Sequence, residues 1–124
     1  MAAMTGSVLV VDDDPAFRRL AGRMLAPFDL AIVGEADSAR SAMEVVGTLR
    51  PDAVLVDVGL PDRDGIALAR ELTALPWQPR VLLTSSNAYA AGETEVRRSR
   101  AEGFIPKEQL PNAALDQLLG GRAP

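Results

Sequence analysis

Short apolar runs alternate with longer amphipathic segments five times along the chain. The runs predict strands over residues 7–11, 30–34, 53–56, 81–84 and 104–106. Two of them, residues 8–11 and 53–56, are continuously apolar rather than alternating. Such runs are typical of strands that are buried on both faces of a parallel sheet.

The segments between these runs predict five helices. The first begins at Pro15 with Asp14 as its N-cap, because the first helical turn tolerates proline. The others are expected over residues 38–49, from about 65 to 75, within 90–101, and after Lys107 up to Gly120-Gly121. The fourth pattern is the weakest, since residues 87–95 are rich in alanine and glycine. We therefore expect a loop there and a shortened fourth helix.

Alternating strands and helices predict an α/β domain with three layers, in which a parallel sheet lies between helices. Right-handed crossovers leave few topologies, and the simplest is a doubly wound, flavodoxin-like sheet of five strands in the order 2-1-3-4-5. Pro106 would then lie on an edge strand, where a missing N–H is tolerated. The 124 residues predict one domain with a core over about 7–119 and short tails. Residues 120–124 could equally be a natural end or the start of a linker.

Composition excludes several function classes. The net charge of −4 argues against direct nucleic-acid binding, and the basic run Arg97-Arg98-Ser99-Arg100 is interpreted as a solvated helix face. The apolar runs are too short for a membrane span, and the absence of cysteine predicts a cytoplasmic location. The chain has no histidine, so it contains neither a phosphohistidine nor an imidazole metal ligand.

Five polar residues follow or end the predicted strands: Asp12, Asp13, Asp57, Thr84 and Lys107. The carboxyl ends of parallel strands share one edge of the sheet, and ligands collect where the strand order reverses. Three neighbouring carboxylates repel one another unless a cation neutralises them. Oxygen ligands without histidine or cysteine favour Mg²⁺. With a lysine and a hydroxyl nearby, one aspartate could act as a nucleophile toward phosphorus.

Four segments together resemble the receiver domains of bacterial two-component response regulators. They are VLVVDDDP at 8–15, DVGLPDRDG at 57–65, VLLTSS at 81–86 and EGFIPK at 102–107. The likeness runs from about residue 7 to 119. The polar residue after Lys107 makes the chain most similar to receivers of the NarL/LuxR type, which carry a helix-turn-helix output domain.

The resemblance implies a role for each site residue. Asp57 would be the phosphoacceptor. Asp12 and Asp13 would form the acidic pair of the magnesium site, with Asp13 as the preferred direct ligand, and Gly59 would offer its backbone carbonyl. Lys107 would pair with the acceptor or with the phosphoryl oxygens. Thr84 and Phe104 would form the switch pair, remodelling the face of the fourth helix, fifth strand and fifth helix.

The resemblance also implies partners. A sensor histidine kinase would supply the phosphoryl group, and the domain would catalyse only its own phosphorylation and dephosphorylation. Readout would be a homodimer through the fourth-helix and fifth-strand face, or a DNA-binding output domain outside this chain. One departure is Glu108, where the family usually has proline after the lysine. The peptide geometry at Lys107-Glu108 is therefore left open.

Three alternatives use the same residues or fold. A haloacid dehalogenase-type phosphohydrolase would also need an aspartate nucleophile, but Pro15 interrupts its motif and no acidic pair follows Lys107. A flavodoxin-type carrier shares the fold, yet carboxylates in the crevice would repel a flavin phosphate. A receiver-like interaction module that works without phosphorylation is the remaining alternative.

Overall fold

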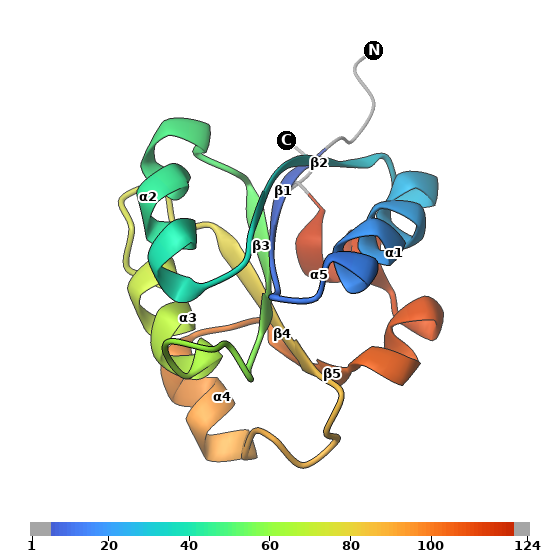
Figure 1. Cartoon of the computed structure of the whole chain (residues 1–124). Helices are drawn as coiled ribbons and strands as arrows, with labels where there is room; N and C mark the ends of the chain where they lie inside the picture. The colour runs from blue at the N-terminus through green and yellow to red at the C-terminus, as the bar shows by residue number, and fades with distance from the viewer. Residues whose placement is uncertain (1–5, 121–124) are drawn as a thin grey trace.

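Five parallel strands form one sheet in the order β2-β1-β3-β4-β5 in the computed structural model, which describes residues 6–120 (Figure 1). The strands are β1 Gly6–Val11, β2 Leu30–Ala36, β3 Ala53–Asp57, β4 Arg80–Ser85 and β5 Gly103–Pro106. The predicted fold class, strand order and all five strands are confirmed. Pro106 ends β5, which is an edge strand as expected.

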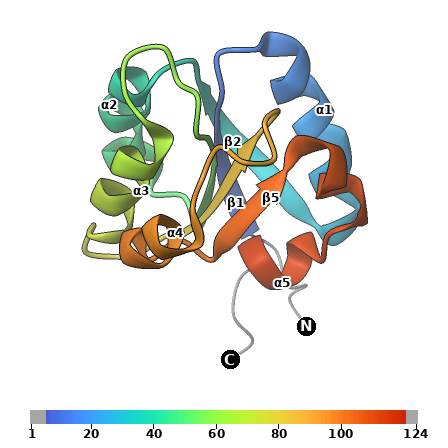
Figure 2. The ribbon, with the colours of Figure 1, turned by 90° about the horizontal axis from the view of Figure 1, so that it is seen from below.

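Helices cover both faces of the sheet. They are α1 Pro15–Leu25, α2 Ala39–Leu49, α3 Gly65–Thr73, α4 Glu93–Ser99 and α5 Leu115–Leu119. Figure 2 shows α1 and α5 on one side of the sheet and α2, α3 and α4 on the other. Asp14 caps α1 as predicted, since its Oδ1 accepts the Ala16 N–H at 2.9 Å. Within residues 6–120 no helix combines the length and apolar character that crossing a bilayer requires.

The core is divided by the sheet into two clusters. Val8 and Val10 face α1 and α5, whereas Leu9 and Val11 face α2 and α3, and none of the four is exposed to solvent. Burying each such side chain stabilises the fold by about 1.5–3 kcal/mol. The continuous apolar runs in β1 and β3 are thus explained, because both strands lie inside the sheet with helices on each face.

The last predicted helix is wrong in extent. The chain after β5 forms a 3₁₀ helix over Lys107–Asn112 and then only the short α5. Pro111 lies inside the 3₁₀ segment and lacks the N–H that an α-helix would need there. The predicted end at Gly120-Gly121 agrees at Gly120, while Gly121 lies outside the described residues.

The fourth helix agrees with expectation, and the structure also gives the peptide geometry that was left open. The fourth helix is short, with seven residues, and follows a loop. The peptide bond between Lys107 and Glu108 is trans, as are all the others described.

Candidate functional site

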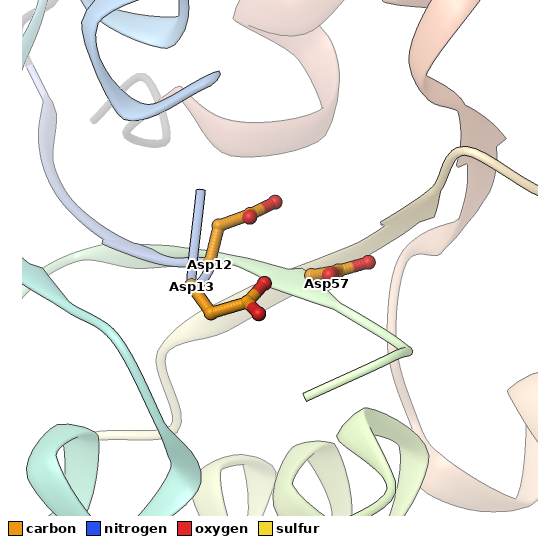
Figure 3. Close-up of side chains that lie close together, drawn as sticks. All are labelled: Asp12, Asp13 and Asp57. Atoms are coloured by element: carbon orange, nitrogen blue, oxygen red, sulfur yellow. The ribbon is translucent and has the colours of Figure 1, made fainter. Parts of the chain in front are cut away.

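Three carboxylates gather at the carboxyl ends of β1 and β3 (Figure 3). Asp57 is the last residue of β3, and Asp12 and Asp13 follow the end of β1. One oxygen from each side chain lies within 4.8 Å of the other two. Asp12 and Asp57 are buried and Asp13 is exposed. β1 and β3 are adjacent in the sheet, so this rim is the topological switch point.

Asp12 is held in place by its backbone and by one carboxylate oxygen. Its N–H donates to the Ala36 carbonyl at 2.9 Å, and its Oδ1 accepts the Asp14 N–H at 2.8 Å. The second oxygen, Oδ2, is buried and accepts no well-directed hydrogen bond. It lies 2.8 Å from the Lys107 ammonium, so we treat that contact as an ion pair between charges. This oxygen is therefore the one whose partner a bound cation could replace.

Lys107 lies between Asp12 and an aromatic ring. It directly follows β5, and its Nζ is 4.3 Å from the centre of the Phe17 ring on α1. A cation over a ring face is attracted by the ring quadrupole, which helps to hold the ammonium at the rim. The expected partners of Lys107 were the acceptor or the phosphoryl oxygens, and in this structure its ion pair is with Asp12.

The pKa of Asp57 is raised above its ordinary value of 3.8. Burial is the largest cause, and the neighbouring charges of Asp12 and Asp13 add to it. The Lys107 charge and the Gly59 N–H, 3.3 Å from Oδ1, act in the opposite direction. The fold thus holds this carboxylate in an environment that disfavours its charge.

Asp57→Asn is expected to stabilise the protein in EDTA at pH 7 by about 1 kcal/mol, roughly 4 °C in Tm, because it removes a repelled charge. Since the folded pKa of Asp57 exceeds the unfolded one, the wild type recovers stability as pH falls through the folded value. The Tm gap between the two proteins should therefore narrow from pH 7 to pH 4. Thermal melts at several pH values check this, and equal Tm values at pH 7 would contradict it.

Thr84 is directly opposite Asp57 in the β3–β4 register. Its side chain is buried, and the hydroxyl donates to the Ile105 carbonyl of β5 at 2.6 Å. The hydroxyl is therefore engaged by the neighbouring strand rather than by the carboxylates. Phe104 is half-buried and lines a hollow of about 400 Å³ between α4 and β5.

Two residues contribute to the site without having been predicted to do so. Arg18 lies on α1, and its guanidinium donates to the Asp12 carbonyl at 2.6 Å and to Glu35 at 2.7 Å. Gly65 lies against the acceptor, because a Cβ at this position would be 2.2 Å from the Asp57 carbonyl oxygen. Gly65 ends the segment at 57–65 that carries the family resemblance, whereas no local pattern marks Arg18.

Comparison with known proteins agrees with this geometry. The family described as response regulator receiver domain matches residues 8–119. A putative transcriptional regulator of Pseudomonas aeruginosa is 36% identical over 103 residues, covering 82% of this chain and 49% of that protein. A protein-glutamate methylesterase/protein-glutamine glutaminase of Pseudoalteromonas atlantica is 36% identical over 107 residues, covering 85% of this chain and 28% of that protein. This chain thus spans half or less of these curated relatives.

Solved structures lead to the same family. A two-component response regulator of the LuxR family from Aurantimonas superposes with a TM-score of 0.80 and 27% identity, over 91% of this chain and 81% of that one. The chain belongs to the response regulator receiver domain family.

Proposed function

We propose that this domain is a phosphorylation switch in which Asp57 accepts a phosphoryl group from a sensor histidine kinase. The observation that carries the proposal is the grouping of Asp12, Asp13 and Asp57 within 4.8 Å, beside the Lys107 ammonium. Membership in the receiver family supports the same conclusion. In this proposal the domain catalyses only its own phosphorylation and dephosphorylation. The proposal includes the cytoplasmic location expected from the sequence.

The donor set fits Mg²⁺. The three clustered side chains offer only carboxylate oxygens, and the buried Oδ2 of Asp12 lacks a directed hydrogen bond. Mg²⁺ takes one or two carboxylates and keeps several waters, so it does not require all three as direct ligands. We assign Asp12, Asp13 and Asp57 as the acidic residues that would hold the ion, with Asp13 as the preferred direct ligand and the Gly59 carbonyl as a further ligand. When bound, the ion would neutralise charge on the transferring phosphoryl group.

Transfer would form a bond between an Asp57 carboxylate oxygen and phosphorus while the phosphorus–nitrogen bond of the kinase phosphohistidine breaks. Lys107 would move from Asp12 toward the phosphoryl oxygens, where its point charge stabilises the transition state. The Thr84 hydroxyl would leave the Ile105 carbonyl and donate to another phosphoryl oxygen. The product carries about two negative charges where Asp57 had one.

Readout would follow from the Thr84 rotation. Loss of its hydrogen bond to β5 frees Phe104 to turn into the hollow beside α4. That movement would remodel the surface formed by α4, β5 and α5, through which a second copy or an output domain outside this chain would bind. The short α5 leaves much of this surface to the 3₁₀ segment Lys107–Asn112.

Intact mass after incubation with acetyl phosphate tests the proposal. The wild type should gain one phosphoryl group with Mg²⁺ and none in EDTA, because the rim carboxylates and the phosphoryl group repel without a cation. Asp57→Ala should gain none, whereas Asp116→Asn, on the exposed surface of α5, should behave as the wild type.

No gain by the wild type from acetyl phosphate or from a purified phosphorylated kinase would reject the proposal and favour an interaction module that works without phosphate. The same samples in light scattering test the homodimer. An unchanged monomer mass after full phosphorylation would reject it.

A further inference from the structure

The loop after the acceptor is tied to a helix from another part of the chain. Asp62 lies in the segment between β3 and α3, and its two carboxylate oxygens accept two N–H groups of α2. Oδ1 accepts from Ala39 at 2.9 Å and Oδ2 accepts from Arg40 at 2.9 Å. These are the first two N–H groups of the helix, which have no partner within it.

The helix has its own cap without Asp62. Ser38 precedes α2, and its Oγ accepts the Ser41 N–H at 3.0 Å while the Ser41 Oγ accepts the Ser38 N–H at 3.1 Å. This capping box begins the helix from local sequence alone. The Asp62 carboxylate therefore adds a tertiary link, and it gains from the positive end of the helix dipole. The two donated hydrogen bonds hold the pKa of Asp62 below its ordinary value, so the link is charged at neutral pH.

Several other hydrogen bonds of the loop lie close to Asp57. The Gly59 N–H donates to Asp57 Oδ1 at 3.3 Å, and Gly59 pairs with Asp64 across the loop. The Gly65 N–H donates to the Val58 carbonyl at 2.9 Å. These bonds lie within the loop or at its junction with α3.

The neighbouring residues Asp62 and Arg63 connect the loop to two different helices. Arg63 forms an ion pair with Glu71, which lies on α3. Among the hydrogen bonds and ion pairs of residues 6–120, those of Asp62 connect the loop to α2. Asp62 is five residues from the acceptor. Val58 and Leu60 keep the loop in the core, so removing Asp62 would break the polar link to α2 and loosen the loop without detaching it.

From these contacts we propose that Asp62 is a positioning residue for the acceptor site. By fixing the loop to α2, it sets where the Gly59 backbone stands relative to Asp57 and to a bound Mg²⁺. This rests on the proposed function. Asp62 touches neither the metal nor the phosphoryl group, so its effect appears in metal affinity and in the rate of phosphoryl gain. The same two bonds make α2 and the acceptor loop move together.

Three variants separate positioning from stability. Asp62→Ala removes both bonds, and Asp62→Asn keeps one acceptor oxygen. Ser38→Ala removes the local cap of the same helix and leaves the loop untouched. Mg²⁺ affinity is measured by isothermal titration calorimetry, the initial rate of phosphoryl gain by mass spectrometry, and Tm by circular dichroism.

Asp62→Ala is expected to weaken Mg²⁺ binding by about tenfold. This is the low end of the roughly 10- to 100-fold losses seen when a residue that supports metal ligands without binding the metal is removed. Its phosphorylation rate at low Mg²⁺ should fall by a similar factor and recover at high Mg²⁺. Asp62→Asn should be intermediate. Ser38→Ala should lower Tm but bind Mg²⁺ as the wild type does. Should Asp62→Ala melt below the assay temperature, Asp62→Asn carries the same test.

Wild-type affinity and rate in Asp62→Ala would overturn the inference, as would an equal loss of affinity in Ser38→Ala. In either case a wild type that gains phosphate leaves the proposed function standing. A wild type that neither binds Mg²⁺ nor gains phosphate would instead remove the proposed function itself.

Discussion

Replacing Gly65 with alanine is expected to destabilise the domain by about 3 kcal/mol, because overpacking against atoms that cannot move lies at the upper end of such costs. The added Cβ would lie 2.2 Å from the Asp57 carbonyl oxygen and 2.8 Å from the Val58 Cα. Both atoms are backbone at the end of a buried strand. No glycine of residues 6–120 has a positive φ, so the constraint here is space and not conformation.

Gly47→Ala is the matched control for this prediction. Gly47 is exposed within α2, and a Cβ there would meet nothing within 4 Å. Alanine favours helix over glycine by about 1 kcal/mol, so this variant should be more stable than the wild type. Urea unfolding measures both changes. A Gly65→Ala protein of wild-type stability would show that the acceptor backbone shifts freely, contrary to its place in the sheet.

The second large effect is expected for Lys107→Met in the absence of metal. The Asp12 side chain is only 1% exposed, and its Oδ2 faces the Lys107 ammonium. Removing the ammonium leaves a buried charge beside two other carboxylates, which costs about 3–5 kcal/mol for a fully buried pair. Because Lys107 is 18% exposed, we expect about 2 kcal/mol in EDTA after screening. Methionine keeps most of the packing of the lysine stem.

Magnesium and a second mutation distinguish the charge from the packing. Saturating Mg²⁺ should stabilise Lys107→Met more than the wild type, because the ion neutralises the charge that Lys107 otherwise offsets and so binds the variant more tightly. Asp12→Asn combined with Lys107→Met should recover most of the loss in EDTA, since no buried charge remains. A double variant as unstable as Lys107→Met would assign the loss to packing.

Much of the architecture was predictable because its signals are local and periodic. Continuous apolar runs predicted the buried strands, and the short spacings between them left few topologies. Pro111 was also visible, and its effect on the last helix should have been expected from the missing N–H.

The sequence by itself determined that Asp12, Asp13, Asp57, Thr84 and Lys107 would meet at one rim, because the carboxyl ends of parallel strands share an edge. Only the tertiary structure decided which of these groups contact one another. Lys107 could reach several carboxylates, and packing over Phe17 places it at Asp12. Arg18 reaches Glu35 across 17 residues of sequence and Asp62 reaches α2 across 22 or more, where no periodic pattern links the partners. A hydrogen bond forms or fails within a few tenths of an ångström, and those distances are set by the packing of the whole domain.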